Sequence, residues 1–279
     1  MESKKKVEMS RTGEIMNQYA IFFDIDGTIV PEDKGGIPDS TIEAIRLAKK
    51  NGHYTFINTG RTYIAIDQFI KDISFDGFVC GCGTNIYLHG QEIMKQELGH
   101  QKSIQIVEDL LAYNIDGILE GNDCIYYRNE CLHPEVDMIK HYRDAFNNQA
   151  EFQKLWDDPD ITFDKMALWI VEGSDFDSFR KKYELEFEVI ERKSDFFELI
   201  PAGFSKATGM DVIAEYLHIP KEHTIAIGDS TNDLSMLANA GISIAMGNSN
   251  PYLFDKVDYV TADIHEDGIY KALEHYNII

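Results

Sequence analysis

The sequence predicts an α/β fold in which a doubly wound parallel sheet is interrupted by a smaller α+β region. Three observations support this prediction. Short apolar segments alternate with helical patterns over 19–80, and the same alternation returns over 208–245. Between these stretches, short segments are separated by glycine-containing turns, which is typical of hairpins. We therefore expect the first and last parts of the chain to share one sheet.

The first half of the predicted sheet begins with an apolar run at 19–23, which is typical of a buried parallel strand. A helix is expected to follow Pro38, because the next residues are small and polar, and to end before Gly52. A second helix is expected between two further strands. These strands are predicted at 54–57 and 77–80.

The second half repeats this order of helix and strand. Its helices are expected at 208–217 and 233–239, and its strands at 224–227 and 242–245. Both halves therefore supply parallel strands to the predicted sheet.

The middle of the chain has a different sequence pattern from the two halves. Hairpins are expected at 86–93 and 117–125, and helical patterns lie at 102–112, 134–146 and 176–183. We therefore predict three parts for the chain. They are a flexible N-terminal lead at 1–18, a Rossmann-like core formed by 19–84 and 201–279, and an α+β cap at 85–200.

The composition describes an acidic globular protein. The 279 residues carry a formal net charge of −22. Such a surface repels nucleic-acid backbones and anionic membranes, so neither is an expected partner. No apolar run approaches the ~20 residues that a membrane helix needs. The cysteines are too few for a disulfide framework, which favours the cytoplasm; they are Cys80, Cys82, Cys124 and Cys131.

Acidic side chains follow two of the predicted strands. Asp24 and Asp26 come at the end of the first strand, and Asp229 follows the 224–227 strand. Residues two apart in an extended chain point to the same side, so Asp24 and Asp26 should face one crevice that Asp229 also reaches. Carboxylates gathered in this way repel one another, and their oxygens suit a hard divalent cation. Asp233 either caps the next helix or supports the metal ligands.

Three further residues predict a phosphate site beside this cluster. Thr59 ends the second strand and is followed by the backbone N–H of Gly60, while Lys206 precedes a helix. A hydroxyl, backbone donors and an ammonium group are what a bound phosphoryl group requires. Arg61 either contacts the substrate or pairs with a nearby carboxylate, and the sequence leaves both readings open.

Taken in order, these segments resemble the four motifs of the haloacid dehalogenase (HAD) superfamily. The motifs correspond to Asp24–Thr28, Thr59, Lys206 and Gly228–Asp233. The middle region is similar to the type IIB cap of the Cof-like phosphatases, as are the segments 58–61 and 198–201. Two details depart from the common pattern: Ala207 follows the lysine where glycine is frequent, and 81–83 replaces an Asn-Gly pair before the cap. Neither change removes a reacting group.

The resemblance implies a role for each motif residue. Asp24 is the expected nucleophile and a ligand of Mg²⁺, the expected cofactor. Asp26 is expected to bind the metal through its backbone carbonyl and to act as acid and base through its carboxylate. Asp229 is the expected third metal ligand. Asn232 joins Thr59, Gly60 and Lys206 as a group that contacts the phosphoryl oxygens.

The function that the resemblance implies is hydrolysis of a small phosphorylated metabolite, such as a sugar phosphate, through an aspartyl-phosphate intermediate. Two alternatives stay open. One is a phosphotransferase or phosphomutase of the same superfamily, and the other is a non-enzymatic sensor of sugar phosphates. The sequence identifies neither the substrate nor the oligomeric state.

Overall fold

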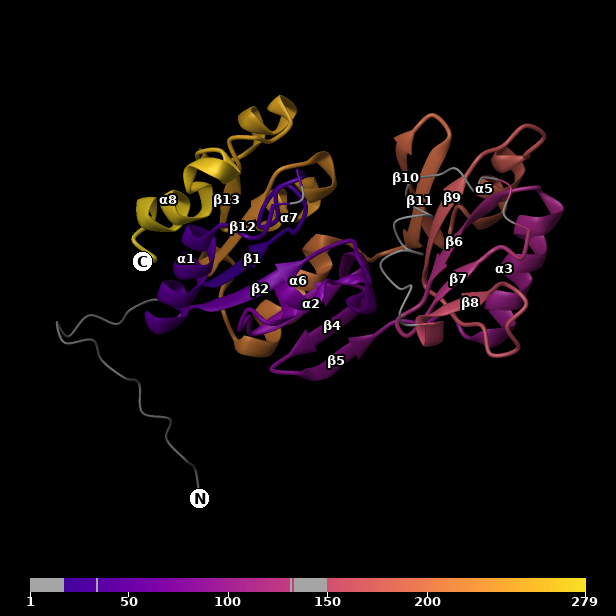
Figure 1. Cartoon of the computed structure of the whole chain (residues 1–279), viewed down its shortest axis with the longest axis horizontal. Coiled ribbons are helices and arrows are strands. Elements are labelled where there is room, and N and C mark those ends of the chain that lie inside the picture. The colour runs from indigo at the N-terminus through magenta and orange to yellow at the C-terminus, as the bar shows by residue number, and fades with distance from the viewer. Residues whose placement is uncertain (1–17, 34, 131, 133–149) are drawn as a thin grey trace, which may run out of the picture.

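The computed structural model describes residues 18–33, 35–130, 132 and 150–279. Two sheets divide these residues into a core and a smaller cap, which lie side by side in Figure 1. Parts of the predicted N-terminal lead and cap lie outside the described residues. These are 1–17, Cys131 and the helix predicted at 134–146.

The core contains an eight-stranded sheet in the order β14-β13-β12-β1-β2-β3-β4-β5. The first six strands in this order are parallel, and the last two form an antiparallel hairpin. The strands are β1 (Ala20–Phe23), β2 (Tyr54–Asn58), β3 (Gly77–Cys80), β4 (Asn85–Leu88), β5 (Gln91–Lys95), β12 (Thr224–Gly228), β13 (Ile242–Ala245) and β14 (Tyr259–Val260). The predicted doubly wound parallel sheet is confirmed.

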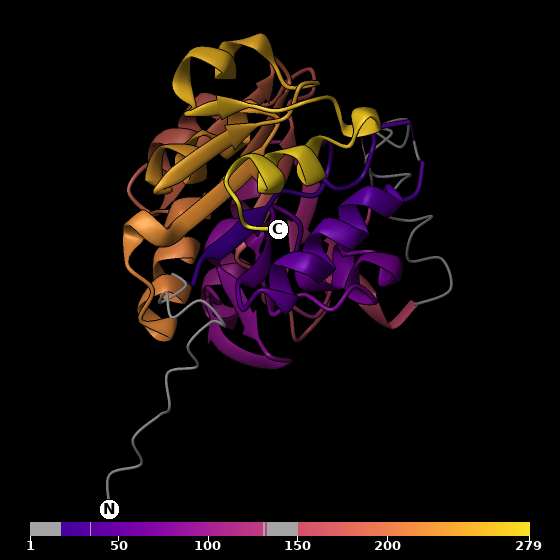
Figure 2. The ribbon, with the colours of Figure 1, turned by 90° about the vertical axis from the view of Figure 1, so that its left-hand side faces the viewer.

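Helices cover both faces of this sheet because its central strands are apolar on both sides. In β1, Ile21 and Phe23 pack under α1 (Asp39–Lys50) and α8 (Gly268–His275). Phe22 faces the opposite side, where α6 (Lys206–Leu217) and α7 (Leu234–Asn239) pack. Figure 2 shows α1 and α8 next to each other on their face of the core.

The hairpin β4–β5 corrects the predicted boundary of the cap. β4 pairs with β3 in the core sheet, so the assignment of residues from 85 onward to the cap is wrong for these two strands. His89 and Gly90 both have positive φ, which is the geometry of a tight two-residue hairpin turn. The hairpin signal was therefore correct, but a local pattern does not reveal which sheet a hairpin joins.

The cap contains a six-stranded sheet in the order β10-β11-β9-β6-β7-β8. Its strands are β6 (Asp116–Glu120), β7 (Ile125–Tyr127), β8 (Gln153–Leu155), β9 (Lys165–Trp169), β10 (Phe187–Lys193) and β11 (Phe196–Pro201). Two helices, α3 (His100–Ala112) and α5 (Phe176–Tyr183), pack on one face through a shared apolar cluster. The chain returns to the core where β11 ends.

The segment between β2 and β3 is less helical than the pattern predicts. It contains a 3₁₀ turn at Tyr63–Ala65 and the short helix α2 (Gln68–Lys71). Ile64 and Ala65 pack against an apolar cluster on the cap sheet, so tertiary contacts set the backbone here. Within the described ranges, none of the helices has the length and apolar character needed to cross a bilayer.

Candidate active site

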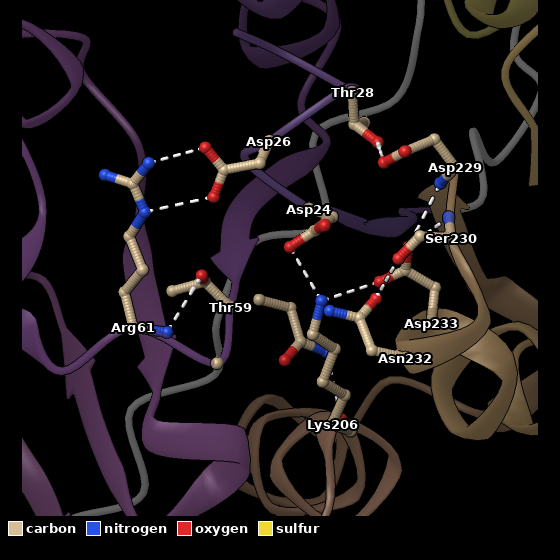
Figure 3. A network of polar contacts seen from close by, with 12 residues as sticks. Asp24, Asp26, Thr28, Thr59, Arg61, Lys206, Asp229, Ser230, Asn232 and Asp233 are labelled. Carbon is tan, nitrogen blue, oxygen red and sulfur yellow. Dashed lines mark hydrogen bonds and ion pairs between the residues drawn. The ribbon is translucent and has the colours of Figure 1, made fainter. Parts of the chain in front are cut away.

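The predicted site residues meet at the carboxyl end of the parallel strands, as Figure 3 shows. Asp24 directly follows β1, Thr59 follows β2, and Asp229 follows β12. β1 and β12 are neighbours in the sheet, and the chain winds in opposite directions from them. This reversal leaves a crevice at the strand ends, which is where ligands bind in open α/β sheets.

Lys206 links two carboxylates at the centre of the site. Its Nζ lies 2.6 Å from Asp24 Oδ1 and 2.6 Å from Asp233 Oδ1. The lysine is 1% exposed, and a buried ammonium group is retained only where partners such as these compensate for lost hydration. The site therefore holds a fixed positive charge against the predicted nucleophile.

Local structure fixes the position of Lys206 as the first residue of α6. Ser205 caps this helix by accepting a hydrogen bond from the N–H of Thr208, whose hydroxyl accepts one from the N–H of Ser205. The carbonyl of Lys206 also accepts a hydrogen bond from Asn58 Nδ2 at 2.9 Å, which ties α6 to the end of β2. This capping box explains why the helix begins two residues earlier than the apolar pattern indicates.

Asp229 approaches the loop after β1 closely. Its Oδ1 accepts a hydrogen bond from the hydroxyl of Thr28 at 2.9 Å. Gly27 has φ of +77°, and a Cβ at this residue would lie 2.4 Å from Asp229 Oδ2. Only glycine suits this position, because it adopts the positive φ without strain and leaves room for the carboxylate.

The charges of the carboxylates around Lys206 favour the binding of a cation. Burial raises the pKa of Asp24 to about 7, helped by Asp233 and opposed by Lys206. Burial likewise raises the pKa of Asp229 to about 7, with Asp233 and Asp24 adding to the effect. Burial would lower the pKa of Lys206, but Asp233 and Asp24 together raise it. Three carboxylates thus share one ammonium group.

Oxygen atoms of Asp24, Asp229 and Asp233 all lie within 4.8 Å of one another. Hard divalent cations prefer such ligands, so the donor set fits Mg²⁺. Asp233 stands inside this cluster, where its Oδ2 also accepts hydrogen bonds from the N–H groups of Asp229 and Ser230. It therefore closes the turn after β12 and faces the cluster at the same time.

Asp26 is oriented differently from the other three carboxylates. Its side chain is 59% exposed and forms a two-pronged ion pair with Arg61, as Figure 3 shows. Arg61 also contacts Asp67, with 3.0 Å between Nη1 and Oδ2. Of the two readings left open for Arg61, the structure shows the carboxylate pair. The expected metal ligand of Asp26, its backbone carbonyl, stays a prediction.

Of the residues predicted to bind phosphate, Thr59, Lys206 and Asn232 lie around Asp24 in Figure 3. The hydroxyl of Thr59 accepts a hydrogen bond from the N–H of Arg61, and the carbonyl of Gly60 accepts one from Lys165. Among the described residues, none accepts a hydrogen bond from the N–H of Gly60. Asn232 lies in the turn after β12, where its Oδ1 accepts a hydrogen bond from Ser230. Their roles toward phosphate stay predictions.

Comparison with known proteins identifies the family. The sequence profile of the haloacid dehalogenase-like hydrolases matches residues 21–273, which include all of these side chains. The chain belongs to this family. The predicted superfamily and the predicted class of enzyme, a HAD-type phosphatase, are confirmed by this match and by the relatives.

Two curated relatives resemble this HAD hydrolase over nearly its whole length. The 5-amino-6-(5-phospho-D-ribitylamino)uracil phosphatase YitU of Bacillus subtilis is 28% identical, covering 92% of this chain and 97% of its own. The pyridoxal phosphate phosphatase YbhA of Escherichia coli is 27% identical, covering 91% of this chain and 97% of its own. A solved sugar phosphatase of HAD subclass IIB superposes with a TM-score of 0.76 at 28% identity, covering 94% and 100%.

Sequence reasoning missed two residues that shape this HAD site. Asn248 donates a hydrogen bond from Nδ2 to the carbonyl of Gly27 at 2.7 Å and accepts one from the N–H of Ile264. The sequence could have pointed to Asn248, because it lies just after β13 as the other site residues lie just after their strands. Lys165 comes from the cap, and nothing in its sequence neighbourhood indicates that it reaches Gly60.

Proposed function

We propose that this HAD hydrolase is a Mg²⁺-dependent phosphomonoesterase that cleaves a small phosphorylated metabolite through an aspartyl-phosphate intermediate on Asp24. The observation that carries the proposal is the contact of Lys206 with both Asp24 and Asp233, next to Asp229. This arrangement combines a buried carboxylate nucleophile with charges that suit a phosphoryl group.

The carboxylates of Asp24 and Asp229, the backbone carbonyl of Asp26 and the neighbouring Asp233 would hold the metal. When bound, Mg²⁺ would supply positive charge that keeps these carboxylates ionised and polarises the phosphoryl group. The chain supplies the rest of the chemistry.

Asp24 would attack phosphorus through a carboxylate oxygen, since it directly follows β1 at the carboxyl edge of the sheet. Lys206 fixes the orientation of that carboxylate and would neutralise charge on the phosphoryl oxygens as they redistribute. The N–H of Gly60 and the hydroxyl of Thr59 stand at the end of the neighbouring strand as further donors. Pre-organised donors of this kind avoid reorganisation during the reaction.

Asp26 would transfer protons on the side of the leaving group. It would first protonate the departing alkoxide and then take a proton from the water that hydrolyses the phosphoenzyme, a role worth about 10²- to 10⁴-fold in rate. In the structure Arg61 holds this carboxylate, whose side chain is 59% exposed, apart from Lys206. Arg61 is therefore the group that positions the proposed acid and base.

The position of the cap favours a small substrate. Ile64 and Ala65 of the core pack against the cap sheet, and Lys165 of the cap contacts Gly60, so the cap lies over the loop after β2. A cap that closes over the crevice from this position would exclude a folded protein, which favours small molecules as substrates. Sugar phosphates and similar metabolites are the proposed class, and a cytoplasmic site of action is part of the proposal.

Release of inorganic phosphate tests this function. The purified protein should release phosphate from members of a panel of sugar and cofactor phosphates when Mg²⁺ is present, and chelation should abolish the release. Asp24→Asn should lower the rate by at least about 10³-fold, because it removes the nucleophile. Interconversion of isomers without phosphate release would identify a mutase instead, and unchanged release by Asp24→Asn would refute the mechanism.

A further inference from the structure

A second group of buried charges lies in the cap, next to the loop that carries Gly60. Lys165, the first residue of β9, places its Nζ 3.2 Å from Glu120 Oε1. The same Nζ donates a hydrogen bond to the carbonyl of Gly60 at 3.1 Å. Gly60 follows the proposed phosphate ligand Thr59, so a buried cap lysine touches the phosphate loop.

Arg192 extends this group toward β10. The pairing of β10 with β11 shifts register between Glu191 and Lys193, which leaves Arg192 without a partner in the ladder. Such a bulge redirects a side chain, and bulges are common beside active sites. Here the Arg192 guanidinium turns onto Glu198, with 2.8 Å between Nη2 and Oε2. Figure 1 shows β10 and β11 on the side of the cap that faces the core.

Glu198 joins Arg192 to Lys165 and so to the core. Its Oε2 lies 3.8 Å from Lys165 Nζ. Burial would raise the pKa of Glu198, but Lys165 and Arg192 lower it, so this carboxylate is charged at neutral pH. Burial would lower the pKa of Arg192, but Glu198 and, more weakly, Asp233 raise it. Arg192 is thus connected to the loop of Gly60 through Glu198 and Lys165.

One donor of Arg192 has no acceptor in the described part of the chain. Its Nε atom is buried, and none of the residues that the structure describes accepts a hydrogen bond from it. Leaving a buried donor unsatisfied is unfavourable, because the group loses its hydrogen bonds to water without gaining another. Such a group calls for an explanation, and a ligand that accepts from Nε would provide one.

The surrounding charges limit the chemistry of that ligand. The two cations, Lys165 and Arg192, are balanced by Glu120 and Glu198, and the buried Asp164 adds a third carboxyl group. Because each cation already has a carboxylate partner, a second anion such as another phosphate or carboxylate is disfavoured. A hydroxyl group accepts from an N–H and donates to a carboxylate, so it satisfies Arg192 and Glu198 together.

We propose that Arg192 and Glu198 form a hydroxyl-binding site in the cap, which selects phosphomonoesters whose leaving group is an uncharged polyol. The inference rests on the proposed function of the core. Arg192 is the specificity-determining residue, and Lys165 positions Glu198 beside the loop of Gly60.

Substrate preference tests this assignment. The ratio of kcat/KM for polyol phosphates to kcat/KM for p-nitrophenyl phosphate is measured in the wild type and in Arg192→Met, with ribose 5-phosphate, glucose 6-phosphate and glycerol 3-phosphate as probes. Losing a hydrogen bond to the leaving group should lower the ratio by about tenfold or more for the preferred probe. Arg180→Met, an exposed cap arginine on α5, should leave the ratio unchanged and serves as the matched control.

Two further variants define the site. Arg192→Lys keeps the charge but lacks Nε, so its ratio should fall between those of the wild type and Arg192→Met. Glu198→Gln keeps the shape and weakens the acceptor, so it should lower the same ratio. Equal ratios in the wild type and Arg192→Met for all three probes would overturn the proposal, as would a wild-type preference for 3-phosphoglycerate, whose leaving group is an anion.

A binding measurement separates this inference from the proposed function. In Asp24→Asn protein with Mg²⁺, calorimetry should show tighter binding of the preferred polyol phosphate than of inorganic phosphate. Adding Arg192→Met should lower the ratio of these two affinities by about tenfold. This readout needs no turnover. An intact protein that releases no phosphate would refute the function, whereas a polyol preference insensitive to Arg192→Met would refute the inference alone.

Discussion

The core crevice and the cap cluster both bury charged side chains, but they balance charge differently. In the crevice, Lys206 pairs with Asp24 and Asp233, which lie beside Asp229, and it is the one cation that pairs with these three carboxylates among the described residues. In the cap, Lys165 and Arg192 face Glu120 and Glu198. The excess of carboxylates in the core favours a metal ion, whereas the cap cluster, in which each cation pairs with a glutamate, favours a neutral ligand. The difference assigns the chemistry to the core and the choice of substrate to the cap.

Replacing the central lysine of the core should produce the largest effect. Lys206→Met leaves three buried carboxylates without their cation, and breaking a buried pair in this way costs about 3–5 kcal/mol. We also expect phosphate release to fall by at least about 10³-fold, because Lys206 orients Asp24 and contacts the phosphoryl group. Thermal unfolding with and without Mg²⁺ and a phosphate-release assay measure both effects.

The matched change in the cap is Lys165→Met. It should also destabilise the protein, because Glu120 and Glu198 lose a partner. Mg²⁺ should recover part of the stability lost in Lys206→Met, since the ion replaces positive charge among the same carboxylates, but it should recover none in Lys165→Met. Equal recovery in the two variants would contradict the contrast between the regions.

Arg61→Met should have an intermediate effect on the core. The variant frees the carboxylate of Asp26 from its ion pair, so we expect kcat to fall by about 10- to 100-fold while KM changes less. We expect kcat to change more than KM because Arg61 positions a proton-transfer group instead of binding phosphate. A rise in KM with unchanged kcat would show that Arg61 binds substrate directly.

The pH dependence of stability should also distinguish the regions. Asp24 and Asp229 have pKa values of about 7 in the metal-free fold, above their unfolded values, so the stability they contribute is present at low pH and is lost as pH rises through about 7. Glu198 has a lowered pKa, so its contribution is lost only as pH falls below its ordinary range. Melting temperatures of metal-free protein between about pH 4 and about pH 8 measure both trends, and Mg²⁺ should raise the melting temperature most at the upper end.

The smallest expected effect is that of Thr28→Val. It removes the hydroxyl that donates to Asp229, a contact worth about 1.5–3 kcal/mol because its acceptor is a carboxylate. We expect weaker Mg²⁺ binding by about tenfold and little change in the preference among substrates. A changed preference would link the crevice and the cap more closely than the structure indicates.

The sequence predicted the core well because its signals are local and tied to strand ends. Asp24, Thr59 and Asp229 each follow an apolar strand, and parallel strands bring their carboxyl ends to one edge. Asp233 shows the limit of this reasoning, because its hydrogen bonds to two backbone N–H groups and to Lys206 became visible only in three dimensions.

The cap was predicted less completely because its contacts depend on register and sheet pairing. The 85–95 hairpin was assigned to the cap, although it pairs with β3 of the core. Arg192 gave no signal in the sequence, since a bulge in β10 is needed to turn it onto Glu198. Lys165 likewise reaches Gly60 only through the packing of the cap on the core.

Calorimetric titration of Mg²⁺ into the metal-free protein near neutral pH tests the central claim most directly. We predict that a single ion binds per chain, that binding releases protons from Asp24 and Asp229, and that Asp229→Asn weakens it by about 100-fold or more. Absence of binding, or an affinity that Asp229→Asn leaves unchanged, would contradict the account.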